Sequence, residues 1–556
     1  MVSWKRFLLF AHLGLLIAAI AFGRWLYAGA LGQSDVLTVF NPYPQVAGSD
    51  ILVHYPVNPY PHINTRSGHI VSNTFVYVRD WYQGLNGRLS VAIMNGLISR
   101  AAKQWCPTPE SFPWWLMRAL SLYCLLAMSL NFMAAVGWIW AKRPGMTLVL
   151  LAAVWSVWIV NPKIYVFSVI YDCLLTDRYV HGYLLSWMII GVIHNWMGRS
   201  AWKWGLLAAG ILFLGSEQDL FSVPVLLMAA AWVGLEGNAD RMRNWFRQAC
   251  YYGAWTGLAA LIFFMSPGQR LKNTCLPINS INDFSPLEWY RRVITLGYGA
   301  IFPRLSDSLW IWHLILYGGL GLILAAWMIM RLKASRLSAS RPSREMFGIG
   351  LMAFAFLTAF LASMTTLIVS SYFPPYALSY PSLLLVTGLA FSFWFILDGA
   401  AMAMDLIASS TRPARFAGTK PIIGYVKAGC TIILPVLVTI VLIGTVTVRA
   451  WPAVSAGYHQ VMEQNRVRRQ LYAEIVKLRD TTGQRYFVLV NLWKAPIWGL
   501  HMDEVWGRAG YFRWRGMEDV ICLTEDEWAA AGRPQEQLYF KFDCAKMIQN
   551  PSDRKR

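Results

Sequence analysis

The run FGIGLMAFAFLTAFLASMTTLIV, from Phe347 to Val369, contains no charged residue, and it follows a linker rich in Arg and Ser, from Arg331 to Arg344. A helix needs about 20 residues to cross the roughly 30 Å of hydrocarbon in a lipid bilayer. Short basic segments beside such helices stay on the cytoplasmic side. The stretch therefore predicts a transmembrane helix that begins at the cytoplasmic face.

The same pattern repeats along the chain and predicts eleven membrane spans. They are Phe7–Tyr27, Leu120–Trp140, Met146–Val160, Val180–Ile193, Trp204–Gly215, Leu220–Leu235, Ala249–Met265, Leu309–Met330, Phe347–Val369, Ala377–Leu397 and Gly429–Val448. Basic clusters border alternate ends of these runs, which predicts a cytoplasmic N-terminus. Three runs between Met146 and Gly215 are short for a full crossing, so one pair could instead be re-entrant.

Composition agrees with a membrane protein. The chain has 556 residues, a mean hydropathy of +0.41, and 14% charged residues. Its net charge of +20 lies mostly in or between the apolar runs, where it indicates anionic lipid rather than nucleic acid as the partner. The first run could be a signal peptide ending at Ala28-Gly29-Ala30, but it is longer than a typical one and is interpreted as a retained helix.

The fold predicted from these features is mainly α. Residues 1–449 form a polytopic transmembrane bundle with a long first extracytoplasmic loop at 31–113, which includes helices at the membrane surface. Residues 450–556 form a small extracytoplasmic α/β domain, with a helix at Tyr458–Leu478 and strands at Arg485–Trp493, Asp519–Leu523 and Gln537–Phe542.

Charged residues inside the predicted spans are few. Asp398 lies near a span end, where its side chain is expected to reach the interface, and His194 and His313 are interpreted as interfacial or packed histidines rather than proton carriers. The polar chemistry is concentrated in the outer loops instead.

Carboxylates and cations of four outer loops are predicted to meet at the outer face. These residues are Asp35, Asp50, Asp80, Asn86 and Arg88 in the first loop, Asp172 and Arg178 in the second, Glu217 and Asp219 in the third, and Arg270, Lys272, Glu288, Arg291 and Arg292 in the fourth. Basic groups can hold a lipid phosphate while a carboxylate takes a proton from an attacking hydroxyl.

Each of these residues also has an ordinary structural explanation. Glu217 and Asp219 interrupt an apolar hairpin and could be a plain polar turn. Arg270 and Lys272 follow a span, where basic residues also anchor to lipid headgroups. His54, His62 and His69 are irregularly spaced, so a metal site is not predicted, although a divalent metal stays compatible with the sequence.

Three segments carry a resemblance to the GT-C superfamily of membrane glycosyltransferases. They are Asp80-Trp81-Tyr82-Gln83-Gly84-Leu85-Asn86-Gly87-Arg88, Ser266-Pro267-Gly268-Gln269-Arg270 and the tail pattern from Gln464 to Val490. Together with the order of spans and loops, they resemble a poorly characterised bacterial branch of that superfamily. The fourth loop has Gln269 where this branch commonly has Asn.

The resemblance implies transfer of a sugar from a polyprenyl-phosphate donor to a glycan or glycolipid acceptor, outside the bacterial cytoplasmic membrane. It also implies a catalytic acidic pair in the first outer loop, but this chain has only single residues there, Asp35 and Asp50. Asp35 is favoured as the base by position, Asp50 follows it closely, and Asp80 is the third candidate. Asp80, Asn86, Arg88, Glu217, Asp219, Arg270 and Lys272 are the expected substrate-binding residues.

Two other function classes stay open. A flippase or exporter of lipid-linked glycans would need a polar path through the membrane. A polysaccharide polymerase or ligase would act on oligosaccharide pyrophosphate and depend on outer arginines.

Overall fold

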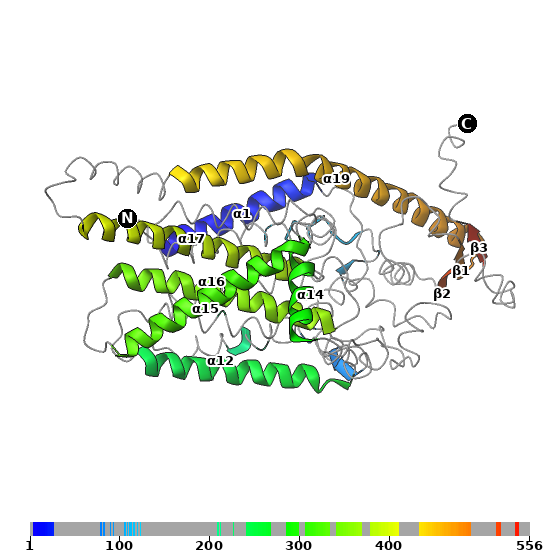
Figure 1. Cartoon of the computed structure of the whole chain (residues 1–556). Coiled ribbons are helices and arrows are strands. Elements are labelled where there is room, and N and C mark those ends of the chain that lie inside the picture. The colour runs from blue at the N-terminus through cyan, green and yellow to red at the C-terminus, as the bar shows by residue number, and fades with distance from the viewer. Residues whose placement is uncertain are drawn as a thin grey trace.

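Helices make up most of the structure, and a small sheet follows them near the end of the chain (Figure 1). The computed structural model describes residues 4–26, 241–267, 285–299, 306–333, 341–369, 378–410, 433–490, 519–523 and 540–543, with short pieces at 78–79, 82–83, 89, 93, 105–106, 108, 111–113, 115–116, 119–120, 123, 208–210, 212 and 226. The helices are α1 (Trp4–Leu26), α12 (Arg241–Phe264), α14 (Pro286–Gly299), α15 (Ser306–Lys333), α16 (Arg341–Val369), α17 (Ser379–Ser410) and α19 (Leu434–Thr482). The strands are β1 (Tyr486–Val490), β2 (Asp519–Leu523) and β3 (Phe540–Asp543).

Among the described residues, 3 helices are long and apolar enough to cross a membrane. Their apolar parts are Leu309–Ile329 in α15, Met346–Thr365 in α16 and Pro381–Ala400 in α17. They coincide with three predicted spans, which confirms a mainly helical protein suited to a lipid bilayer. The total of eleven spans and the sidedness of the loops stay predictions, because much of the chain between 27 and 240 lies outside the described residues.

The core lies between α16 and α17, which pack side by side (Figure 1). Phe356 of α16 and Phe391 of α17 stack with ring centroids 5.7 Å apart, and both are fully buried. At Gly388, a Cβ atom would lie 2.8 Å from Leu357 Cδ2 and 3.1 Å from the Leu357 backbone nitrogen. The two backbones come this close because position 388 has no side chain, a common feature of helix pairs in membranes.

Hydroxyl groups inside this pair bond to their own helix. Thr387 donates to the Leu383 carbonyl at 2.7 Å, and Ser392 donates to the Gly388 carbonyl at 2.7 Å. A carbonyl one turn back gives each hydroxyl a partner where water is scarce. The pair therefore needs no polar contact between its helices to satisfy these groups.

Asp398 differs from its prediction. Its side chain is 8% exposed and lies two residues before the end of the apolar part of α17, so it is buried against protein, which the sequence pattern did not indicate. Packing against neighbouring residues encloses a position that a hydropathy pattern alone places at a span end. His313 is 1% exposed, so of the two predicted alternatives, interfacial or packed, the structure supports the packed one.

α19 is one continuous helix where a span, Gly429–Val448, and a separate helix, Tyr458–Leu478, were predicted. Pro452 lies inside it, and a proline removes one backbone donor without necessarily ending a helix. The predicted boundary between residues 449 and 450 therefore falls within the helix. Figure 1 shows α19 carrying the chain from the bundle to the sheet.

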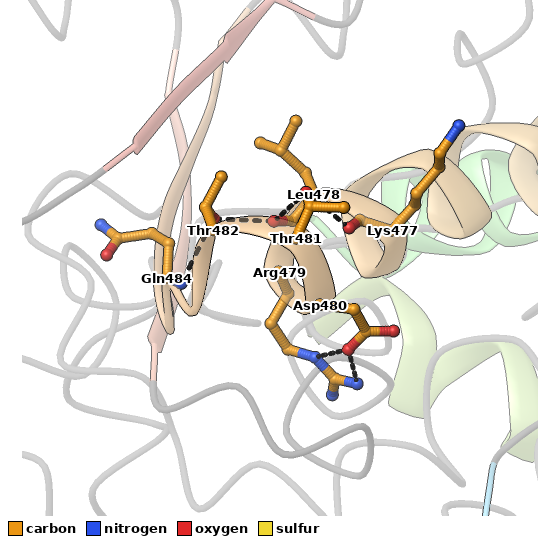
Figure 2. A network of polar contacts seen from close by, with 7 residues as sticks. All are labelled: Lys477, Leu478, Arg479, Asp480, Thr481, Thr482 and Gln484. Carbon is orange, nitrogen blue, oxygen red and sulfur yellow. Dashed lines mark hydrogen bonds and ion pairs between the residues drawn. The ribbon is translucent and has the colours of Figure 1, made fainter.

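The end of α19 has a well-formed cap (Figure 2). Gly483 has a φ of 69°, a left-handed conformation that glycine adopts without strain, and its N–H donates to the Arg479 carbonyl at 2.8 Å. Thr482 Oγ1 donates to the Leu478 carbonyl at 2.7 Å and accepts from the Gln484 N–H at 3.3 Å. These contacts end the helix and start the sheet within three residues.

The sheet has the order β2-β1-β3, with both pairs parallel. Val488 of β1 aligns with Ile521 and with Lys541, and Phe487 of β1 is fully buried. β1 and β2 lie at or within their predicted ranges, and β3 extends one residue past its predicted end at Phe542, so the mixed helix-and-strand tail is confirmed. Its extracytoplasmic location stays a prediction.

Candidate functional site

The two ends of the first loop lie close together. Two contacts join α1, which precedes the loop, to residues that follow the loop. The Arg24 guanidinium of α1 stacks on the ring of Trp115, 5.0 Å from its centroid. His12 Nδ1 of α1 and Tyr123 Oη are 3.1 Å apart. A Cβ atom at Gly23 would lie 2.4 Å from Ala119 Cβ, so α1 and the segment around Ala119 are in backbone contact. The loop therefore leaves and re-enters the bundle at one place.

The middle of the first loop contacts the carboxyl end of α12. Tyr82 Oη donates to the Ile262 carbonyl at 2.8 Å, and Ser266 Oγ donates to the Tyr82 carbonyl at 2.6 Å. The two partners of the second bond are 184 residues apart in the chain, and Ser266 is fully buried. Tyr82 and Ser266 belong to the first two segments that carry the family resemblance, and the structure brings those segments into contact.

The predicted site residues themselves lie outside the described residues. They are Asp35, Asp50, Asp80, Asn86, Arg88, Glu217, Asp219, Arg270 and Lys272. Their placement stays a prediction, but in the sequence Asp80, Asn86 and Arg88 lie near Tyr82, and Arg270 and Lys272 lie near Ser266. Asp80 precedes Tyr82 by two positions, and Arg270 follows Ser266 by four.

The fourth loop of the predicted topology contains a helix, α14, that was not predicted. Ser285 caps it: Ser285 Oγ accepts from the Glu288 N–H at 3.2 Å, and the Ser285 carbonyl accepts from the Trp289 N–H at 2.9 Å. Pro286 occupies the first helical position, where its missing N–H costs nothing. The Ser-Pro-x-Glu signal was readable in the sequence and could have located this helix.

α14 lies across α15 and α16 and contacts α17 as well (Figure 1). It buries Val293, Ile294 and Tyr298 against them. Its exposed side carries Arg291 and an ion pair between Arg292 and Glu288, with Nη2 and Oε1 3.1 Å apart. The helix thus presents a charged face at one end of the bundle.

A histidine and three tyrosines join α14 to the bundle. Tyr298 Oη and His313 Nδ1 are 3.0 Å apart. Around the imidazole lie Tyr290 at 6.1 Å, Tyr317 at 6.2 Å and Phe360 at 5.9 Å between ring centroids. His313 Nε2 and Tyr290 Oη are buried and have no hydrogen-bond partner among the described residues.

Burial raises the pKa of Tyr298 and of Tyr290 above the usual value for a phenol. Both hydroxyls therefore stay protonated near neutral pH and can donate. The Tyr298–His313 contact is a hydrogen bond between α14 and the bundle. This cluster is a packing feature rather than a place where substrate can enter, since His313 is almost completely enclosed.

Within the described ranges, no group of three or more His, Cys, Asp or Glu side chains is arranged to hold a metal ion. The chain matches no protein-family model, and no significant match to it is found among curated proteins or solved structures.

Proposed function

We propose that the chain is a membrane glycosyltransferase that moves a sugar from a polyprenyl-phosphate donor to a glycan or glycolipid acceptor outside the cytoplasmic membrane. One observation carries the proposal. Tyr82 and Ser266 join the loop segment that carries Asp80, Asn86 and Arg88 to the segment that carries Arg270 and Lys272.

Chain connectivity limits how far those candidates can be from the contact. A chain spans at most about 3.6 Å per residue, so the Cα atom of Asp80 lies within about 7 Å of that of Tyr82. By the same limit, the Cα atom of Arg270 lies within about 14 Å of that of Ser266. Both residues are therefore close in the chain to the Tyr82–Ser266 contact. From there the Asp80 carboxylate could serve the attacking hydroxyl while the Arg270 guanidinium serves the departing phosphate.

The direction of α12 supports a shared outer side. Its first turns carry Arg241, Arg243 and Arg247, which favour the cytoplasmic face. Tyr82 contacts the opposite end of this helix. The first and fourth loops therefore meet at the end that the positive-inside rule assigns to the outside.

The chemistry requires few groups. The acceptor hydroxyl oxygen attacks the anomeric carbon, the bond from that carbon to the phosphate oxygen breaks, and the hydroxyl proton passes to the carboxylate of Asp35, Asp50 or Asp80. Arg88, Arg270 and Lys272 stabilise the charge that develops on the departing lipid phosphate. Asn86, Glu217 and Asp219 are assigned to acceptor binding.

The test is transfer by the full-length protein in lipid nanodiscs, with radiolabelled polyprenyl-phosphate sugars and membrane glycan as acceptor. Asp35→Asn, Asp50→Asn and Asp80→Asn are compared with wild type, and the variant of the true base is expected to lose about 100-fold or more in rate. Asp480→Asn is the matched control, because Asp480 is exposed at the end of α19 and pairs with Arg479. Wild-type transfer in all three first-loop variants would contradict the assignment of the base.

An exporter of lipid-linked glycans is the second candidate, favoured by Asp398, an ionisable residue that is buried in a membrane-length helix. If the protein is an exporter, Asp398→Asn should slow movement of a labelled polyprenyl-linked glycan across vesicle membranes, and no donor should support sugar transfer. If the protein is a transferase and not an exporter, the wild-type protein should not move the labelled glycan across the vesicle membrane.

A further inference from the structure

We infer that Tyr82 is a positioning residue: by capping α12 from the first loop, it holds the segment around Asp80 against the segment that leads to Arg270. The role of Tyr82 in positioning a catalytic segment rests on the proposed transferase function. The attachment of Tyr82 to α12 does not, and it can be measured without any enzymatic activity.

The carboxyl end of α12 explains why a tyrosine is needed. The last four carbonyl groups of an α-helix have no partner within the helix and need one from elsewhere. The Leu261 carbonyl accepts from the Met265 N–H at 2.9 Å, and the Phe263 carbonyl accepts from the Ser266 N–H at 3.3 Å. The Ile262 carbonyl between them accepts from Tyr82 Oη at 2.8 Å. A side chain 180 residues away thus completes the end of this helix.

Two hydrogen bonds attach Tyr82 to α12 and the residues that follow it, and the donor lies on opposite sides in the two bonds. The side chain of Tyr82 donates to the backbone of α12, while the side chain of Ser266 donates to the backbone of Tyr82 at 2.6 Å. One bond would fix a distance and leave the loop able to turn about it. Two bonds, one to the side chain and one to the main chain of the same residue, also fix the orientation of the loop backbone.

Burial makes the attachment durable. Ser266 is fully buried, and Tyr82 is partly buried. Water therefore has little access to the Ser266 hydroxyl, and breaking its bond to Tyr82 carries a cost that a bond at the surface would not. The backbone at Tyr82 is therefore held more firmly than an ordinary surface loop.

The orientation matters because a general base works only within hydrogen-bonding distance of the hydroxyl that it deprotonates. Small displacements of a reacting group lower the rate steeply. If Tyr82 positions the segment that bears Asp80, its loss should lower kcat and leave the KM for the donor nearly unchanged.

The experiment uses the full chain in nanodiscs with Tyr82→Phe, Ser266→Ala and Ser266→Thr. Amide hydrogen exchange is followed in peptides that cover residues 78–83 and 258–266, and transfer kinetics are measured in parallel. Tyr82→Phe and Ser266→Ala are each expected to speed exchange in both peptides and to lower kcat about 5- to 10-fold, the effect of losing one net hydrogen bond. Ser266→Thr keeps the hydroxyl and should restore both.

Tyr252→Phe is the matched control. Tyr252 lies on the same helix, is fully buried, and its hydroxyl bonds to Gln248 within α12 at 3.3 Å. Its loss should leave exchange at residues 78–83 unchanged.

The outcomes separate the two proposals. Faster exchange in Tyr82→Phe, together with a wild type that is inactive on every donor, would remove the transferase function and keep the attachment. Unchanged exchange at 78–83 in Tyr82→Phe would overturn the attachment. Faster exchange with wild-type kcat would overturn the positioning role, and so would a Tyr252→Phe variant that behaves like Tyr82→Phe.

Discussion

The α16–α17 pair and the contact between the first and fourth loops are stabilised by different forces. In the helix pair, stacked rings and a close backbone approach at Gly388 hold the two helices together, and hydroxyls such as that of Thr387 bond within their own helix. At the loop contact, two hydrogen bonds join segments far apart in the chain. The helix pair therefore depends on complementary shape, while the contact between the loops depends on a few directional bonds.

The largest effect should come from emptying the shape-dependent core. Phe391→Ala removes a fully buried ring that stacks on Phe356 and should destabilise the protein by about 3 kcal/mol or more. Phe393→Ala, on the same helix but 37% exposed, is the control and should cost much less. Thermal unfolding in detergent measures both, and equal losses would contradict the burial of Phe391.

Overfilling the same contact should cost somewhat less. Gly388→Leu places atoms where Leu357 already lies and should destabilise by about 2 kcal/mol through displaced side chains and backbone. Gly444→Leu on α19 meets nothing within 4 Å and should leave the unfolding temperature unchanged. A similar loss in both variants would contradict the close approach at Gly388 as the cause of the loss, because leucine favours a helix more than glycine does.

A polar contact of the outer helix should be next in size. Tyr298→Phe leaves His313 Nδ1 without its hydroxyl partner in a buried place, which should cost about 1–2 kcal/mol. Tyr317→Phe is a sharper control, because its partner Thr358 keeps a 2.8 Å bond to the Phe354 carbonyl. Amide exchange in α14 should rise in Tyr298→Phe and stay near wild type in Tyr317→Phe, and the reverse order would refute this view of α14 docking.

The smallest effect is expected at the cap of α14. Ser285→Ala removes the side-chain acceptor of the Glu288 N–H and should weaken the first turn by about 1 kcal/mol. Ser285→Asn retains an acceptor and should behave like wild type. Local exchange at residues 288–292 reports the change, and an unaltered rate in Ser285→Ala would show that tertiary packing alone holds the helix.

Patterns local to one segment predicted the structure well. The runs at 309–330, 347–369 and 377–397 coincide with α15, α16 and α17, because about 20 apolar residues have few stable alternatives to a membrane-length helix. The strands were found for a similar reason, since short apolar runs with many branched side chains favour extended structure. A helix start within a loop, Ser285 to Glu288, was equally local and was overlooked.

Contacts between distant segments could not be derived in the same way. Neither Tyr82 nor Ser266 stands out from its neighbours in sequence, and their bond depends on how two loops fold over the end of α12. The enclosure of Asp398 is similar, because hydropathy along a helix gives depth in the membrane but not which side faces a neighbour. The candidate catalytic residues were chosen from charge and family resemblance, and they remain predictions.

Membrane character, helix positions and the composition of the tail follow from the order of residues, because hydrophobicity and backbone propensity act over a few turns of chain. The capping of α12 by Tyr82, the docking of α14 through Tyr298 and the burial of Asp398 follow from packing in three dimensions. Such contacts form only when segments separated by tens or hundreds of residues meet, and the free energy of each depends on the whole set of neighbours that excludes water from it.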